Sequence, residues 1–194
     1  PFGGTGNNIF NPAAAGVAFA IVAFPSMVFA YPIPRAPLPI FPGAELATVS
    51  SPLFTLGVGG VPSYDLISMA LGNVPGPMGA TNTLVLLACL FYLISRRTLE
   101  WEIPVFFLLT TALISFSFPV LEIGRVESML YEMMNGLLLF GAVFLLGDPV
   151  TRPKRRWANI FYAILAGVVV MIFRRIGRIE EELVFAILLM NTLV

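Results

Sequence analysis

The sequence contains no histidine, only one cysteine and few charged residues. With no histidine and with Cys89 alone, the chain cannot form a zinc site of Cys and His ligands or an intrachain disulfide. The 11 Lys and Arg residues are balanced by 11 Asp and Glu residues, so the formal net charge is zero. The sequence also lacks a basic patch with interleaved aromatic residues, so no nucleic acid is expected as a partner. Cys89 lies in an apolar run and is expected to pack as a small hydrophobic residue.

Apolar side chains dominate what is present. Hydrophobic residues make up 58% of the chain and charged residues 11%, and the mean hydropathy is +0.90. Soluble domains carry about 25% charged residues, so this chain has too few to cover a wetted surface. The composition predicts a polytopic membrane protein with a single membrane domain over residues 1–194. The last apolar run begins at Leu183 and holds twelve residues, whereas a spanning helix needs about 20, so a longer protein is expected.

Six apolar segments have the character of membrane helices. They are predicted over residues 13–31, 81–95, 103–120, 131–147 and 157–173, with a sixth beginning at Leu183. Pro25 is expected to kink the first of them. The segment 32–79 is rich in Pro and Gly and is predicted as one long loop, which at that length is usually functional or disordered. The fold class expected is therefore an all-α membrane protein with about six visible transmembrane helices of a larger bundle.

Lysine and arginine in the short loops predict the orientation of these helices. The loop "DPVTRPKRRW", residues 148–157, carries four basic residues and is expected to be cytoplasmic. Arg96 and Arg97 fall on the same side, whereas Arg174 and Arg175 fall on the opposite side and disagree. This orientation places the long loop 32–79 outside the cytoplasm.

Two Gly-rich turns lead into helices. Gly4-Thr5-Gly6 lacks the third glycine and the preceding strand of a dinucleotide fingerprint, so a Rossmann site is not expected. Asn11 is predicted to cap a helix with Pro12 at its first position. A second turn, residues 72–80, leads into the helix at Thr81. Such helix starts can receive an anion or a polar ring edge, or they can be capped turns buried by neighbouring helices.

Acidic residues show no pattern typical of catalysis. Glu132 and Asp148 are predicted near helix ends, in solvated or capping roles rather than as a proton relay. The sequence contains no recognisable pair of nucleophile and base, so a hydrolytic enzyme is not expected.

Four collinear motifs resemble one family over nearly the whole chain. They are "FGGTGNNIFNPAAAG" (2–16), "GNVPGPMGATNTLVLLACLFYLISRRTLEWEIPV" (72–105), "NGLLLFGAVFLLGDPVTRP" (135–153) and "RRIGRIEEELVFAILLMN" (174–191). The resemblance is to the RnfD/NqrB family of membrane flavoproteins, which has members in the Rnf complex and in the sodium-pumping NADH:quinone oxidoreductase. The closing segments are more similar to the member from the Rnf complex.

This resemblance implies a helical fold similar to urea and ammonium channels, with FMN joined by a phosphoester to a Thr or Ser and with a non-covalent riboflavin. In "ELATVSS", residues 45–51, Glu45 matches the acid of the attachment motif, Thr48 its hydroxyl and Ser51 the acceptor, and Pro52 follows as in the family. Val49 and Ser50 replace the Gly and Ala of the motif. The "GAT" that ends at Thr81 is a second candidate, although it lies where the family begins a helix. Asn11 and Thr81 complete the set of candidate cofactor-binding residues.

The leading hypothesis is a membrane electron carrier of an Rnf-type ferredoxin:NAD⁺ oxidoreductase in a bacterial or archaeal inner membrane. Electron transfer through flavin would be coupled to movement of Na⁺ or H⁺, and the other subunits of the complex would be its partners. The alternatives are a component of the quinone-reducing type, a channel or transporter for a small polar solute, and a structural component without flavin. The channel hypothesis is favoured by the two interrupted helix entries and by the expected lack of buried charge.

Overall fold

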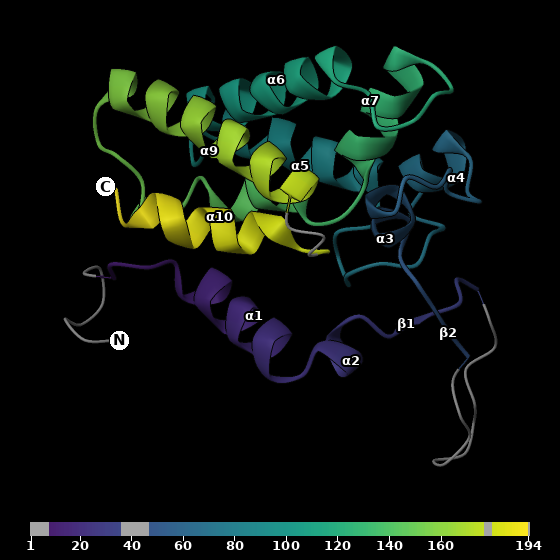
Figure 1. Ribbon diagram of the computed structural model, residues 1–194. Helices are drawn as coiled ribbons and strands as arrows, with labels where there is room; N and C mark the ends of the chain where they lie inside the picture. Colours follow the sequence, from purple (N-terminus) through teal and green to yellow (C-terminus); the bar gives the residue numbers. More distant parts are fainter. Residues whose placement is uncertain (1–7, 36–46, 177–179, 194) are drawn as a thin grey trace.

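The computed structural model describes residues 8–35, 47–176 and 180–193, and almost all of its regular structure is helical. Figure 1 shows α6 and α9 side by side, with α10 and then α1 beneath them and the short elements α3, α4, β1 and β2 at one end. The elements in chain order are α1 (Pro12–Ala23), α2 (Pro25–Val28), β1 (Tyr31–Pro32), β2 (Thr48–Val49), α3 (Pro52–Gly57), α4 (Leu66–Ala70), α5 (Thr83–Ser95), α6 (Glu102–Ser117), α7 (Arg125–Met134), α8 (Leu138–Phe140), the π-helix η1 (Gly141–Leu145), α9 (Arg156–Ile176) and α10 (Glu182–Asn191). The prediction of a helical protein is confirmed.

Helix α9 is the one helix of the described residues that is long and apolar enough to cross a membrane unaided. Helix α7 and the α8–η1 segment meet the same criterion only if they are taken together as one bent span. Helices α1, α5, α6 and α10 are apolar but shorter, with 10 to 17 residues each. Helical structure therefore covers at least part of each predicted segment. By length and composition, one helix could span a membrane, or two if the bent pair counts as one span.

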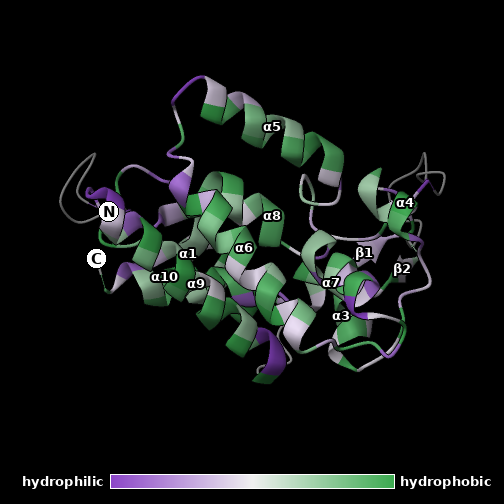
Figure 2. Ribbon diagram, turned by 90° about the horizontal axis from the view of Figure 1, so that it is seen from above, coloured by the Kyte–Doolittle hydropathy of each residue, from purple (hydrophilic) through white to green (hydrophobic). Residues whose placement is uncertain are grey.

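Large apolar side chains cover the outside of the bundle. Figure 2 shows α5 at the edge of the molecule with mostly hydrophobic residues along its length. Leu84, Val85 and Phe91 of this helix are exposed, as are Phe19 of α1 and Phe161 of α9. Exposed apolar surface on this scale is rare in soluble monomers and is what a lipid-facing surface requires.

The first helix begins where its sequence predicts, but the helical structure ends at Val28 and not at residue 31. The Asn11 side-chain oxygen accepts hydrogen bonds from the amides of Ala13 and Ala14, at 3.0 and 3.2 Å, and Pro12 occupies the first turn. The chain leaves the helix after Ala23 and restarts at Pro25, because proline cannot donate to the preceding turn. Both the predicted cap and the predicted interruption are confirmed.

The helix predicted over residues 131–147 is wrong. Helix α7 begins earlier, at Arg125, and ends at Met134, and the chain then bends by 65° before α8. Gly136 lies in this bend with φ +67°, a conformation that residues with a Cβ rarely adopt. A Cβ there would also approach Leu53 Cδ2 within 2.6 Å, so α3 packs directly against the break.

The loop predicted over residues 32–79 is also wrong in its described part. Helices α3 and α4 lie within it, and Tyr31 pairs with Val49 and Pro32 with Thr48 in a short antiparallel ladder between β1 and β2. Pro52 at the first position of α3 is compatible with helix, because its missing N–H is not needed there. Helical periodicity is invisible in elements of five or six residues.

Helices α6 and α9 run in the same direction and pack closely. Glu102 and Arg156 meet at their first residues, with 3.2 Å between Oε1 and Nε, and Arg175 donates to the Phe118 carbonyl at their far ends. Gly167 permits the close approach, since a Cβ there would lie 3.0 Å from Thr110 Cβ. Helix α10 runs the opposite way, so its first residues lie near the end of α9 and its last residues near the beginning.

Candidate functional site

Each end of α9 borders a large cavity. One lies at the beginning of the helix, beside the basic loop 148–155, and the other at its end, beside Arg174 and Arg175. A helix of 21 residues is about 30 Å long, so the two cavities lie at opposite depths of the bundle.

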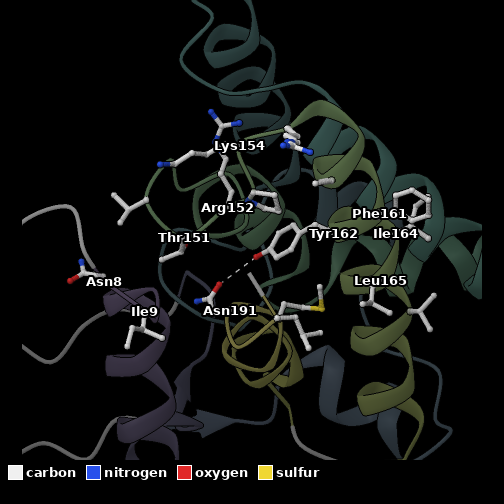
Figure 3. Close-up of a pocket in the computed structure, with 17 residues that line it drawn as sticks. Asn8, Ile9, Thr151, Arg152, Lys154, Phe161, Tyr162, Ile164, Leu165 and Asn191 are labelled. Atoms are coloured by element: carbon white, nitrogen blue, oxygen red, sulfur yellow. Dashed lines mark hydrogen bonds between the residues drawn. The ribbon is translucent and has the colours of Figure 1, made fainter. Parts of the chain in front are cut away.

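The cavity at the beginning of α9, called the α9-start cavity below, has a volume of about 1080 Å³. Figure 3 shows an apolar side formed by α9, with Phe161, Ile164 and Leu165, facing the polar side chains of the loop. Asn8 and Ile9 close the cavity from the segment before α1. An apolar wall with a few polar groups is the usual composition of a small-molecule site.

One polar pair is buried in this cavity. The Tyr162 hydroxyl from α9 donates to Asn191 Oδ1 from α10 across 3.5 Å, a long hydrogen bond (Figure 3). Asn191 Nδ2 is buried and has no hydrogen-bond partner among the described residues. A buried amide without a hydrogen-bond partner lowers the stability of the fold by about 1–3 kcal/mol. A ligand with an acceptor atom at this position would supply the missing partner of Asn191 Nδ2.

Basic side chains form the rim of the same cavity. Arg152 pairs with Glu100, at 3.6 Å between Nη2 and Oε1, whereas Lys154 and Arg155 are exposed and make no ion pair within the described part of the chain. Asp148 does not enter the cavity. Its carboxylate accepts from the Val150 amide and from the Thr151 hydroxyl, each at 3.2 Å, which confirms the predicted capping role.

Asn11, predicted to bind cofactor, is occupied by structural contacts. Its oxygen caps α1, and its Nδ2 donates to the Leu145 carbonyl at the end of η1 across 3.1 Å. Its side chain is buried and does not line the α9-start cavity. The neighbouring Asn8 does line it. Asn191 is the last residue of the motif 174–191 but was not singled out from it, and it contributes the unpartnered amide of the cavity.

Ser51, the predicted acceptor of FMN, is the N-cap of α3. Its hydroxyl accepts from the Phe54 amide at 3.1 Å and donates to Glu180 Oε2 at 2.8 Å. The residue is 4% exposed. Thr48 is exposed in β2, and Glu45 lies outside the described residues. The Ser51 hydroxyl therefore acts once as an acceptor and once as a donor.

Ser51, Pro52 and Thr81 converge on one small cavity of about 10 Å³, together with Gly136 and Glu181. The structure thus brings together both candidate attachment points, from segments 30 positions apart. A phosphoester on Ser51 would remove the proton donated to Glu180 and place a second anion beside that carboxylate and Glu181. Attachment of FMN at Ser51 would therefore need the contact with Glu180 to be released and α3 to move.

Buried ion pairs at the end of α9 were not predicted from the sequence. Arg174 Nε lies 2.6 Å from Glu182 Oε1, and Arg174 Nη1 donates to the Glu132 carbonyl at 2.6 Å. Arg175 Nη2 lies 3.2 Å from Glu132 Oε1. Glu132 is 1% exposed inside α7, so the prediction that it is a solvated or capping residue at a helix end is wrong. The sequence does place arginines at the end of one apolar run and glutamates at the start of the next, and this pattern could have indicated the ion pairs.

Comparison with known proteins gives one consistent result. The whole chain, residues 1–194, matches the NQR2, RnfD, RnfE family. It is 31% identical over 221 residues to the D subunit of the ion-translocating oxidoreductase complex of Stutzerimonas stutzeri, covering 100% of this chain and 62% of that protein. It is 32% identical to the D subunit of the Na⁺-translocating ferredoxin:NAD⁺ oxidoreductase complex of Acetobacterium woodii, covering 98% of this chain and 56% of that protein.

A further relative is the D subunit of the proton-translocating ferredoxin:NAD⁺ oxidoreductase complex of Clostridium ljungdahlii, which is 30% identical over 97% of this chain and 58% of that protein. The chain therefore spans less than two thirds of the length of these relatives.

Proposed function

The chain belongs to the NQR2, RnfD, RnfE family, and on this basis we propose that it acts as a membrane component of an Rnf-type ferredoxin:NAD⁺ oxidoreductase complex. The D subunits of two such complexes match nearly the whole chain. One is named for Na⁺ translocation and the other for proton translocation, so the coupled ion in this proposal is one of these two. The other subunits of the complex are the proposed partners.

The membrane setting of the proposal is supported by α9 and by the exposed apolar side chains. The proposal includes six spans, a likeness to urea and ammonium channels, and a location in a bacterial or archaeal inner membrane. Helices α1, α5, α6 and α10 are shorter than a span, so in this proposal they cross the hydrocarbon only in part or together with neighbouring segments.

The α9-start cavity is the proposed site of a non-covalent flavin such as riboflavin. Its volume of about 1080 Å³ is at the upper end of ordinary ligand pockets. Phe161 and Leu165 would contact an apolar ring face, and the unsatisfied Nδ2 of Asn191 would donate to a ring acceptor. A flavin bound here would supply one- and two-electron transfer, and the protein would bind and orient it. The unpartnered Asn191 amide is the observation that carries this assignment.

Covalent FMN on Ser51, the site that the motif suggests, would require a rearrangement of α3. The Ser51 hydroxyl holds α3 and Glu180, and the cavity beside it has a volume of about 10 Å³. The channel alternative loses one of its two supports, the expected lack of buried charge. Glu132 and Glu182 are 1% and 2% exposed and are both paired with arginine.

Flavin release from the purified full-length protein tests the assignment. Asn191→Ala is expected to lower the flavin released by acid denaturation about tenfold, the effect of one hydrogen bond to a buried amide. Asn73→Ala is the matched control, because Asn73 lines a different cavity, and it should leave the flavin content unchanged. Equal flavin content in both variants and the wild type would refute the site.

A second readout concerns covalent attachment. In-gel fluorescence of the denatured full-length protein should show no flavin band that depends on Ser51. A band present in the wild type and lost in Ser51→Ala would instead establish Ser51 as the attachment point, and α3 would have to rearrange to admit the phosphate.

A further inference from the structure

The second cavity of the bundle contains charge that the proposed flavin site does not use. It lies at the end of α9, has a volume of about 620 Å³, and is called the α9-end cavity below. Its apolar side comes from α3, with Leu53, Phe54 and Leu56. Its polar side comes from α7, α9 and the turn before α10, and consists of Glu132, Arg174, Arg175, Glu180 and Glu182.

Glu132 and Arg174 are each held by several contacts. Both oxygens of Glu132 lie within reach of Arg175 Nη2, at 3.2 and 3.4 Å, and Oε2 also accepts from the Ser115 hydroxyl at 3.1 Å. Arg174 is shared between Glu182 Oε1 and the Glu132 carbonyl. These contacts fix the orientation of the cluster. Neither arginine donates a hydrogen bond to the second carboxylate oxygen of Glu182, Oε2.

Glu182 Oε2 is the exception. This atom is buried, Glu182 is 2% exposed, and no hydrogen-bond partner reaches Oε2 from the described residues. A buried carboxylate oxygen without a partner is strongly unfavourable, because its solvation has been lost without compensation. Since Glu182 lines the α9-end cavity, the cavity is the place from which a compensating group would come.

Counting the charges indicates the charge of that group. The titratable and charged groups gathered here, over the elements packed together, are Glu132 of α7, Arg174 and Arg175 of α9, Glu180 and Glu181 of the turn, Glu182 of α10, and Tyr31 of β1. Four carboxyl groups thus face two guanidinium groups within the described part of the chain. If all four carboxyls were ionised, the excess would be two negative charges.

Glu181 removes one of these charges. It is 3% exposed, and its Oε2 accepts from the Leu137 amide at 3.0 Å. Burial, together with the charge of Glu182, raises the pKa of Glu181 to about 8, so this carboxyl is protonated near neutral pH. Burial also raises the pKa of Glu180, although its hydrogen bond from Ser51 opposes the shift. With Glu181 neutral, three further carboxyl groups face two guanidinium groups, so the cluster has one more acidic side chain than basic ones.

We propose that the α9-end cavity binds one monovalent cation, Na⁺ or a proton, at Glu182 Oε2. The inference rests on the proposed function, since it supplies a binding site for the ion that such a complex moves. A multivalent metal ion does not suit the site, because no group of three or more metal-ligating side chains occurs in the described ranges. One carboxylate oxygen is sufficient for a proton, and with cavity water it is sufficient for a weakly held Na⁺.

The location suits a site where an ion enters or leaves the protein. The cavity is open between α3 and the helix ends, and Val58 and Gly59 lie exposed at its rim. It lies at the end of α9 opposite the basic loop, which under the predicted orientation is the outer side. The cation and the proposed flavin would therefore occupy opposite ends of the one membrane-length helix.

Equilibrium measurements on the intact complex, without ferredoxin or NAD⁺, test the proposal. Binding of radiolabelled Na⁺ would show that the bound cation is Na⁺. A carboxyl C=O infrared band that shifts in D₂O and is insensitive to Na⁺ identifies the proton. Glu182→Gln should abolish Na⁺ binding, or remove one carboxyl band while the band of protonated Glu181 remains. Glu127→Gln, at an exposed residue of α7, should leave the wild-type signal unchanged.

A second pair of variants avoids the buried ion pair, in case Glu182→Gln does not fold. Val58→Arg places a positive charge at the rim and should weaken Na⁺ binding about threefold to tenfold, or shift the proton titration to lower pH. Val58→Glu should change the same quantity in the opposite direction, and Val58→Leu should have no effect. These substitutions leave Arg174 and Glu182 untouched.

The outcomes are distinct from those that test the proposed function. Loss of the Na⁺ or carboxyl signal in Glu182→Gln, with opposite effects of the two charged Val58 variants, supports the site. Signals identical to the wild type in Glu182→Gln and in both Val58 variants overturn it. An intact complex that binds the cation as expected but lacks ferredoxin:NAD⁺ activity would contradict the proposed function alone.

Discussion

Arg174 and Glu182 form a buried ion pair that joins α9 to α10, with 2.6 Å between Nε and Oε1. Their side chains are 8% and 2% exposed. The same guanidinium also binds the carbonyl of Glu132 at 2.6 Å, so one side chain links three helices at the point where α7 ends. Buried ion pairs are costly to break from one side only, because the remaining partner becomes an unpaired buried charge.

Removing one partner of this pair should therefore be far more damaging than removing both. Arg174→Met is expected to lower the free energy of unfolding by about 3–5 kcal/mol, because it strands Glu182. Arg174→Met combined with Glu182→Leu should recover most of that loss. Thermal unfolding of the detergent-solubilised protein measures both variants. A double variant as unstable as the single one would show that the pair is not the source of the effect.

The cap on α3 gives a smaller and separable effect. Ser51→Ala removes the hydrogen bond to the Phe54 amide and the donor to Glu180, and should lower stability by about 1 kcal/mol. Ser51→Asp keeps a capping oxygen but adds a charge beside Glu180, so it should be less stable than Ser51→Ala. The comparison of their unfolding midpoints checks this order, and the reverse order would mean that Glu180 is protonated or displaced.

Glu181 should make stability depend on pH. Its pKa is raised from 4.5 to about 8 in the folded protein, mainly by burial and then by Glu182, so the folded state holds a proton that the unfolded state releases. The resulting stabilisation is complete below pH 4.5 and is lost as the pH rises through about 8. The slope in that window cannot exceed about 1.4 kcal/mol per pH unit for one group.

Glu181→Gln keeps the shape of this side chain without its titration, so it should flatten the pH dependence between these limits. Unfolding midpoints measured from about pH 5 to about pH 9 provide the comparison, with the exposed Glu127→Gln as control. An unchanged slope in Glu181→Gln would assign the titration to another group of the cluster.

Gly136 should be intolerant of any side chain. Gly136→Ala would place a Cβ at φ +67° and within 2.6 Å of Leu53 Cδ2, and the conformation alone costs about 1–2 kcal/mol. Leu53→Ala should relieve the steric part but not the conformational part, so the double variant should be less damaged than the sum of the two single variants. Gly57→Ala, at a position with open space, is the matched control for unfolding measurements.

Parts of the site were accessible from the sequence, and others were not. The Asn11–Pro12 cap and the Asp148 turn were predicted, because a capping side chain contacts amides only two or three residues away. Ser51 was selected by its motif, but its partner Glu180 lies 129 positions further along the chain. Asn191 was missed because it sits inside an apolar run, where nothing local distinguishes a buried amide from a helix-end residue.

The helical and apolar character of this chain, its family, and the starts of α1, α5, α6, α9 and α10 could all be read from the order of its residues. These properties follow from composition, capping and collinear motifs, which act over a few residues or over the whole chain at once. Tertiary packing was needed to separate α7 from α8, to bury Glu132 and Glu182 against Arg175 and Arg174, and to make Ser51 the cap of α3 instead of a group facing an open cavity. The reason is that a buried charge or a strained glycine is tolerated only where distant segments supply the compensating contact, and packing selects those segments.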